Sequence, residues 1–375
     1  MRTKGTIDCL IVGGGIAGTV LALELDRHGH SVRLLDPQRP ERTASRVAAG
    51  ILNPVTGKRL VRSWRADELL EAAHRWYPVI EATLGVRAFE PITIQRLYRD
   101  ADEPTRWRKR THQPEYQPFL GTAAEPGAIH PNLRDDFGSF TIEQAAVLDT
   151  ETFLDAAEAF LDQRELRLQG DMDYAAVALT PNGVRWGELE ARCLVFCEGW
   201  RMSCNPWFGW IPLEPARGEV LEVRTELDLP RRVYNREKWV LPLGNGVLRI
   251  GSTWAWEHLD APTSPQGRTA LLQGLRSMLR LPEAAPHILR HRAGVRPASQ
   301  DRLPVVGRHP AHPQLAVFNG LGSKGTLYAP LLAEQLRVHL FQDVPLLPDI
   351  DVMRFANRLA TSDNAAPRLP CPRNA

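Results

Sequence analysis

Residues 6–25 read TIDCLIVGGGIAGTVLALEL, and this stretch decides the fold. Its first half is a short apolar run that ends in glycines, which predicts a buried strand. Its second half stays apolar with no helix breaker before Gly29, which predicts a helix. Between them, Gly13, Gly15 and Gly18 have the G-x-G-x-x-G spacing. In this context Gly13 permits a tight turn, Gly15 lets a pyrophosphate approach the backbone, and Gly18 lets helix and strand pack closely.

A second apolar strand follows the helix and ends at an acidic residue. Residues 31–35 read SVRLL and lead into Asp36, about 20 residues after the glycine motif. A carboxylate here accepts hydrogen bonds from the ribose of an adenosine, whereas a site for NADP needs a positive charge. The helix start beyond the glycines offers free N–H groups and a partial positive charge to phosphates. We therefore predict a dinucleotide site; a glycine-rich turn that binds no nucleotide is the alternative.

Bulk properties limit the remaining choices. The chain has 375 residues, too many for one ordinary core, so we expect two domains. Its net charge of +2 implies no polyanionic partner. The five cysteines show no paired zinc-knuckle spacing, so we expect buried free thiols, no metal site and a reduced, cytoplasmic chain. The apolar N-terminal stretch fits a dinucleotide strand better than a signal peptide, and we expect no membrane span.

Three further stretches carry chemical hypotheses. Residues 43–54 (TASRVAAGILNP) are rich in small side chains that permit approach by a large flat ligand, or they form a plain loop with a helix start at Ser45. Residues 106–110 (RWRKR) form a basic cluster, for which a solvated helix face is favoured over a nucleic-acid contact. Residues 320–326 (GLGSKGT) form a second glycine-rich turn that opens a helix.

The rest of the pattern predicts a mixture of helices and strands. We expect helices at 64–84, 149–161, 271–281 and 327–340. A hairpin is expected at 171–179 and 183–190, and buried strands at 191–199 and 315–320. Strands at 218–223, 238–243 and 247–251 predict an antiparallel sheet. The polar tail after Ala360 is expected to be disordered.

In this order, the motifs resemble the D-amino-acid-oxidase-like family of FAD-dependent amine oxidoreductases, most closely its glycine oxidase and sarcosine oxidase branch. The resemblance spans about residues 5–345 and rests on the glycine motif with Asp36, residues 43–50, residues 217–220 (RGEV), and residues 294–297 (GVRP) with the segment 301–326 that follows. It implies an α/β fold: a Rossmann-like FAD-binding domain and a second α+β substrate domain built on an antiparallel sheet. We expect the first domain at 1–84, 145–212 and 291–345, the second at 85–144 and 213–290, and a partly disordered C-terminal extension at 346–375.

The resemblance also implies FAD, held noncovalently because no cysteine stands near the usual covalent position. The ADP half would contact Gly13, Gly15, Ile16, Gly18, Asp36 and Pro37, with Met172 near the adenine. The pyrophosphate and flavin would lie along Thr43, Ala44, Ser45, Ala48, Ala49 and Gly50. The pyrimidine edge of the flavin would face Gly320, Leu321, Gly322, Ser323, Lys324, Gly325 and Thr326. Gly199 and Gly294 complete the expected cofactor residues.

Three residues are implied as catalytic. Arg296 matches the family's carboxylate-binding arginine, whose planar fork suits an amino-acid carboxylate; a structural ion pair is the alternative. Lys324, with the helix N-terminus beside it, would stabilise negative charge near N1 of reduced flavin. Trp239 falls near a position where glycine oxidases use a tyrosine, and Ser323 where they have an arginine. These departures leave the substrate open.

The expected function is FAD-dependent oxidation of the C–N bond of a small-molecule amine or amino acid, by hydride transfer to flavin N5. No His-Asp or Ser-His constellation stands out, and none is required if the amine enters neutral. Oxygen or another acceptor would reoxidise the cofactor. Three alternatives stay open. They are oxidation of an aminomethyl-modified tRNA base, a flavoprotein without catalytic activity, and a dehydrogenase that binds only NAD, although Asp36 and the second glycine turn fit FAD better.

Overall fold

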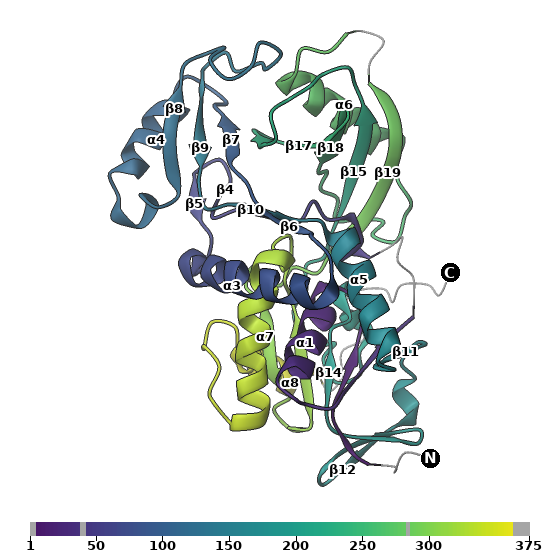
Figure 1. Cartoon of the computed structure of the whole chain (residues 1–375). Coiled ribbons are helices and arrows are strands. Elements are labelled where there is room, and N and C mark those ends of the chain that lie inside the picture. The colour runs from purple at the N-terminus through teal and green to yellow at the C-terminus, as the bar shows by residue number, and fades with distance from the viewer. Residues whose placement is uncertain (1–4, 38–42, 283–285, 363–375) are drawn as a thin grey trace.

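The predicted strand and helix of the glycine motif are β1 (Ile7–Val12) and α1 (Ile16–Arg27). The chain then enters β2 (Val32–Asp36), which pairs parallel to β1. The computed structural model describes residues 5–37, 43–282 and 286–362, and Figure 1 shows the whole chain. Both strands are apolar along almost their whole length because a parallel sheet is covered on both faces.

The first sheet contains the glycine motif at the carboxyl end of its central strand. Its order is β11-β2-β1-β14-β13-β12, and β21 and β20 continue from β14. The strands β2, β1, β14 and β21 run parallel, which confirms the Rossmann-like arrangement. The further strands are β11 (Arg167–Gln169), β12 (Val177–Thr180), β13 (Gly183–Trp186), β14 (Leu189–Phe196), β20 (Val305–Arg308) and β21 (Leu315–Asn319).

Helices packed on this sheet are joined by a buried charge. The carboxylate of Glu24 in α1 accepts hydrogen bonds from Trp76 Nε1 and Arg337 Nε, each at 3.0 Å. These partners lie on α3 (Ala66–Leu84) and α7 (Gly325–Gln342), so one carboxylate connects three helices (Figure 1). A fourth helix, α5 (Thr150–Gln163), begins at Asp149, whose side chain caps the Thr152 N–H.

The second sheet lies above these helices in Figure 1 and has the order β19-β15-β18-β17-β16-β7-β9-β8. Neighbours are antiparallel except β16 and β7, which run parallel. One face packs on α6 (Pro265–Met278) and the other is turned toward the glycine motif. The strands are β7 (Ile94–Leu97), β8 (Leu120–Ala124), β9 (Ser139–Ile142), β15 (Ala216–Arg224), β16 (Val233–Asn235), β17 (Trp239–Gly244), β18 (Val247–Gly251) and β19 (His287–Arg296).

Short elements connect the two sheets. A small sheet of order β3-β10-β6 and a β4–β5 hairpin lie between them, and α4 carries the basic cluster. The elements between the sheets are α2 (Ala44–Val47), β3 (Ile51–Leu52), β4 (Val55–Thr56), β5 (Val61–Arg62), β6 (Phe89–Pro91) and β10 (Ala146–Leu148). By contrast, α4 (Glu103–Thr111) packs beside β8 at the edge of the second sheet, and α8 (Ala356–Ser362) lies with the first sheet.

Several predicted boundaries were wrong for local reasons. The helix expected at 271–281 is α6, which begins at Pro265 because Ser264 caps it by accepting from the Gly267 N–H at 3.0 Å. The first hairpin strand begins at Val177, since residues 174–176 form a 3₁₀ turn. The disordered tail was expected after Ala360, but residues 361–362 still belong to the helix Ala356–Ser362, and residues 363–375 lie outside the described residues. The domain division stays a prediction, and its boundary at residue 291 lies inside β19.

The cysteines follow the expectation in part. Cys9, Cys193 and Cys197 are free and buried, as expected. Cys204 is disulfide-bonded, so the expectation of a free thiol is wrong there. Across the described ranges, no helix is long and apolar enough to cross a membrane, and no group of histidine, cysteine or carboxylate side chains is placed to hold a metal ion.

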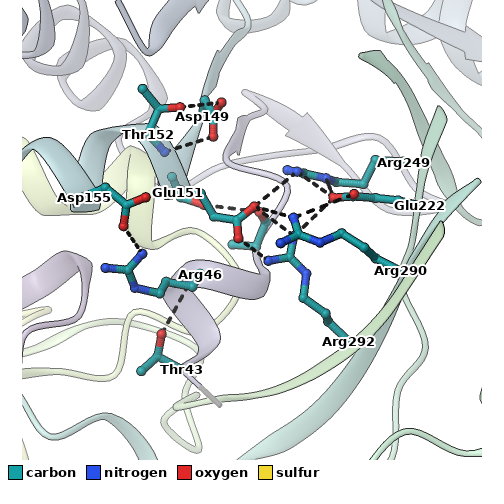
Figure 2. A network of polar contacts seen from close by, with 12 residues as sticks. Thr43, Arg46, Asp149, Glu151, Thr152, Asp155, Glu222, Arg249, Arg290 and Arg292 are labelled. Carbon is teal, nitrogen blue, oxygen red and sulfur yellow. Dashed lines mark hydrogen bonds and ion pairs between the residues drawn. The ribbon is translucent and has the colours of Figure 1, made fainter. Parts of the chain in front are cut away.

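An ion cluster fixes α5 to the second sheet. In Figure 2, the carboxylates of Glu151 on α5 and Glu222 on β15 lie among the guanidinium groups of Arg249, Arg290 and Arg292. Arg292 Nη1 lies 2.5 Å from Glu151 Oε1, and Arg249 Nη2 lies 2.8 Å from Glu222 Oε1. Burial raises the pKa of Glu151, but the hydrogen bond from Arg292 and the three arginine charges outweigh burial and lower it.

Replacing Glu151 with glutamine should lower the free energy of unfolding by about 2 kcal/mol, because partly buried arginines lose a shared partner. Since the folded-state pKa of Glu151 lies below its ordinary value of 4.5, this stabilisation is present above that pH and is lost as the pH falls through the folded-state pKa. Denaturant unfolding of wild type and Glu151→Gln at several pH values measures both effects. Glu226→Gln, an exposed carboxylate on the loop after β15, is the control; equal losses in the two variants would contradict the cluster's role.

Candidate functional site

A cavity of about 770 Å³ lies between the glycine motif and the second sheet. Its size falls within the range of small-molecule and cofactor sites, roughly 300–1,000 Å³. The predicted site residues that line it are Gly13, Gly15, Ile16, Asp36, Pro37, Thr43, Ala44, Ser45, Ala48, Ala49, Gly50, Met172, Gly199, Trp239, Gly294, Arg296, Leu321, Gly322, Ser323, Lys324, Gly325 and Thr326. Of the predicted residues, Gly18 and Gly320 do not line it.

The glycine loop has almost no room for side chains. Gly13 has φ of +106°, and a Cβ there would lie 2.5 Å from the carbonyl oxygen of Cys197. A Cβ on Gly18 would lie 2.0 Å from the carbonyl oxygen of Gly13, which explains why Gly18 packs the helix and does not reach the cavity. The Gly14 N–H donates to Asp36 Oδ1 at 2.9 Å, so the acid after β2 is held at the loop.

Two helices direct their N-termini into this cavity. Neither N-cap residue, Gly15 of α1 or Lys324 of α7, caps its own helix with a side chain, and neither first turn contains an acid. Their positive ends therefore stay available to an anion. The Ile16 N–H donates to Ser45 Oγ at 2.9 Å, which fixes α2 beside the start of α1. Arg46 of α2 pairs with Asp155 of α5 (Figure 2), so the segment is anchored from both sides.

Lys324 lies at the start of α7 in a buried position. Its Nζ donates to Ser63 Oγ at 2.8 Å, and Ser63 Oγ in turn donates to the carbonyl oxygen of Asn53 at 2.9 Å. Burial lowers the pKa of Lys324 to about 8. Gly320 has φ of +74° and makes the turn that brings Lys324 to the cavity. The lysine is therefore cationic below about pH 8 and neutral above it.

Arg296 ends β19 with its guanidinium group over the backbone of Gly218. A Cβ on Gly218 would lie 2.0 Å from Arg296 Nη2, so a larger residue would displace the arginine. Nη2 donates to Ser252 Oγ at 2.7 Å, and the guanidinium carbon lies 4.1 Å from the ring centre of Trp254. Burial lowers the pKa of Arg296 to about 10, so it stays charged at neutral pH. Within the described ranges no carboxylate pairs with it, unlike the structural ion pair considered from sequence.

Trp239 begins β17 and lines the cavity on the side of the second sheet. It pairs with Gly251 across β17 and β18, and a Cβ on Gly251 would lie 2.2 Å from its Cζ2 atom. The indole therefore lies flat over Gly251, which needs to be glycine at this point. Trp239 is half-buried and faces the same cavity as Arg296 and Lys324.

Sequence reasoning missed part of the lining. Arg96, Arg99 and Arg236 come from β7 and β16 and their following loops, and no motif marks them. Glu198 was also missed. Burial raises its pKa against the lowering effect of hydrogen bonds from Tyr174 and Asn205. Asn53, Thr56 and Gly57 also line the cavity and were not among the predicted site residues.

Comparison with known proteins defines the class. The family model for FAD dependent oxidoreductases of the DAO type matches residues 8–337, so the chain belongs to this family. It is an FAD-dependent oxidoreductase with the mixed α/β fold that the resemblance predicted. This confirms the predicted family, fold class and cofactor.

Individual relatives place the chain within the family. It is 29% identical, over 94% of its length, to the tRNA 5-methylaminomethyl-2-thiouridine biosynthesis bifunctional protein MnmC of Azoarcus sp. (strain BH72), and 25% identical over 95% to the bifunctional protein ThiO/ThiG of Trichormus variabilis. The chain spans 60% and 56% of the lengths of these proteins. Glycine oxidase from Geobacillus kaustophilus shares the fold with a TM-score of 0.77 at 20% identity, covering 93% of this chain and 98% of that one. Iminodiacetate oxidase from Chelativorans sp. BNC1 has a TM-score of 0.74 at 21% identity, covering 91% and 98%.

The residues present fit FAD. The glycine loop excludes side chains, and two helix N-termini whose N-cap residues provide no side-chain cap suit phosphate and an electron-rich ring. A carboxylate is fixed where a ribose would lie. The cavity also extends past this region to Arg296, which leaves space for a second molecule. The donor set therefore supports a cofactor and a substrate in one continuous site.

Proposed function

We propose that the chain oxidises the C–N bond of a small amine or amino acid that is bound by Arg296. The observation that carries this proposal is a half-buried guanidinium group, without an acidic partner among the described residues, in the cavity that also contains the glycine loop and Lys324. A free buried charge is unfavourable unless a ligand balances it, and a carboxylate matches the fork of an arginine. An amino-acid substrate supplies that carboxylate.

FAD would be held along the whole first domain. Asp36 would accept from the ribose, the N-terminus of α1 would face the pyrophosphate, and residues 43–50 would run along the flavin. Residues 320–326 and the N-terminus of α7 would face its pyrimidine edge. When bound, FAD supplies the two-electron acceptor for the oxidation.

The chain's own residues then orient the substrate. Arg296 would bind the carboxylate in a two-pronged contact, while Ser252 and Trp254 hold the guanidinium in place. Trp239 would close the cavity over the substrate and exclude water. None of the described residues that line the cavity is a histidine. The amine would therefore enter in its neutral form, and the reaction would need no protein base. Activity should therefore rise with pH toward the pKa of the substrate amine.

A substrate panel tests this proposal. Purified protein is incubated with amines and amino acids, and ammonia or free amine, oxo product and peroxide are measured, with an artificial electron acceptor in parallel. Turnover of carboxylated amines supports the proposal, and peroxide formation indicates oxygen as the acceptor. Retention of FAD without turnover of any amine would favour the alternative of a flavoprotein without catalytic activity.

Lys324→Met should make the reduction potential of bound flavin more negative by about 30 mV, a tenfold change for a two-electron couple, because a positive charge near the ring is lost. Burial lowers the pKa of Lys324 to about 8, so in wild type the potential should fall more steeply with pH above about 8. Reduction then takes up an additional proton at the lysine. Spectroelectrochemical titration across pH measures both effects.

Lys58→Met, an exposed lysine on the β4–β5 turn, is the control for Lys324→Met. It removes one positive charge of the same kind away from the cavity lining. A wild-type pH profile retained in Lys324→Met would show that Lys324 does not act on the flavin.

A second candidate function is oxidation of an aminomethyl-modified tRNA base. The specific observation is the 29% identity to a protein of tRNA 5-methylaminomethyl-2-thiouridine biosynthesis over 94% of this chain. The basic helix α4 would be the contact surface, although Arg106 is already paired with Asp100 at 2.8 Å. A tRNA gel shift at increasing salt separates the candidates, since phosphate contacts weaken steeply with salt. Absence of binding at low salt would remove the tRNA candidate.

A further inference from the structure

Three further arginines line the same cavity as Arg296. Arg96, Arg99 and Arg236 all contribute to the lining, and in each of them the Nε atom is buried without a hydrogen-bond partner. The Arg236 carbonyl oxygen accepts from Arg96 Nη1 at 2.8 Å and from Arg99 Nη2 at 3.1 Å. These contacts gather the side chains of Arg96 and Arg99 at the backbone of Arg236, whose own guanidinium group donates to the carbonyl oxygen of Arg134. We call these three arginines the arginine cluster.

The arginine cluster is short of negative charge. Arg96 Nη2 lies 2.9 Å from Glu103 Oε1, and both side chains are almost fully buried. In the described part of the chain, neither Arg99 nor Arg236 forms an ion pair. Burial lowers the pKa of Arg236, and the charges of four nearby carboxylates counteract this only in part; they belong to Asp136, Glu237, Asp135 and Glu103. Among the described residues, therefore, Glu103 forms an ion pair with Arg96, and the guanidinium groups of Arg99 and Arg236 form none.

The sheet register relates the arginine cluster to Arg296. Arg96 pairs with Asn235, Asn235 with Trp239, and Trp239 with Gly251, so the four lie in one row across β7, β16, β17 and β18. Gly251 is followed by Ser252, to which Arg296 donates. Three strand spacings separate the two ends of the row, about 14 Å between backbones. Because arginine side chains are long, the distance that a ligand must span between Arg96 and Arg296 is shorter than this backbone separation. Trp239 lies between the two ends of the row.

We propose that the arginine cluster binds a second anionic group of the substrate, so that the enzyme acts on an extended amine with an acidic group at each end. This inference rests on the proposed function for the location of the reacting amine. The substrate carboxylate at Arg296 fixes one end, and a carboxylate or phosphate at the arginine cluster fixes the other. Both kinds of group match guanidinium donors. Because Arg96 is buried and all three arginines line the same cavity as Arg296, a small ligand fits better than the backbone of a nucleic acid.

A binding titration tests the proposal without turnover. Linear diacids from glutarate to suberate are titrated into the FAD-loaded protein, each beside the monoacid of the same length, with the flavin absorbance and tryptophan fluorescence as readouts. The best diacid should bind at least about tenfold more tightly than its monoacid, the size of one additional charge-assisted contact. A phosphonate-terminated carboxylate series distinguishes a preference for phosphate from one for carboxylate.

Substitutions in the arginine cluster test whether these residues cause the preference for diacids. Arg236→Met and Arg99→Met should each reduce the preference for the diacid over the monoacid to about threefold or less. Two variants are used so that the test still works if one of them does not fold. Arg108→Met on α4, exposed and outside the cavity lining, should keep the wild-type preference. Equal affinities for diacids and monoacids in wild type, or a preference unchanged in both variants, would overturn the proposal. So would tight binding of a single-stranded RNA oligonucleotide that depends on Arg236 while diacids do not bind. The substrate panel reports on amine oxidation separately, so the two proposals fail independently.

Discussion

Replacing Arg296 with leucine should lower kcat/KM for amino-acid substrates by about 30-fold or more, equivalent to about 2 kcal/mol for a lost charged hydrogen bond in a buried site. The loss should appear mainly in KM, because the carboxylate contact is present in the ground state as well as in the transition state. Amines without a carboxylate should show little change. Steady-state kinetics with paired carboxylated and uncarboxylated amines measures this difference.

Two further variants make the Arg296 result interpretable. Arg296→Lys keeps the charge but loses the planar fork that reaches Ser252, so it should recover only part of the affinity. Arg224→Leu, exposed at the end of the neighbouring strand β15, removes an arginine away from the cavity and should leave kinetics unchanged. Wild-type KM values in Arg296→Leu would remove this residue from the substrate site.

Gly13→Ala should yield a colourless, destabilised protein. The new Cβ would lie 2.5 Å from the carbonyl oxygen of Cys197, and alanine would be held at φ of +106°, where side chains are strained. Together these effects should cost about 3 kcal/mol or more and displace the loop that the pyrophosphate would approach. FAD content per chain and denaturant unfolding measure the two consequences.

Gly29→Ala is the matched control for Gly13→Ala. Gly29 also has positive φ, +80°, but a Cβ there would meet nothing within 4 Å. It should cost only about 1 kcal/mol and leave the FAD content unchanged. Full FAD content in Gly13→Ala would show that the close packing at this loop is not needed for the cofactor.

The cofactor half of the site could be predicted because its signals are local. The glycine spacing, the strand before it and the acid after β2 lie within residues 6–36, and their physical roles follow from sequence position alone. The structure then places Asp36 on the Gly14 N–H, as this logic requires. The second glycine turn was equally visible: Gly320 has φ of +74° and Lys324 lines the cavity, while the contact of this turn with a flavin stays a prediction.

The substrate half could not be predicted in the same way. Arg96 meets Asn235 only because β7 and β16 pair in parallel, and nothing local in either segment determines that partner or register. Ser63 meets Lys324 across 261 positions of the chain. The start of α6 was missed because its first turn is polar and is set by the cap at Ser264, whereas the apolar pattern begins only at Leu271.

The central claim is that one cavity holds FAD beside an amine substrate. An anaerobic titration tests it most directly: FAD-loaded protein is mixed with a carboxylated amine while the flavin spectrum is recorded and the oxo product is quantified. We expect the visible flavin bands to bleach with one oxo product formed for each flavin reduced, and Arg296→Leu to need far more substrate. A protein that refuses FAD on reconstitution, or bound flavin that stays oxidised with every amine tested, would contradict it.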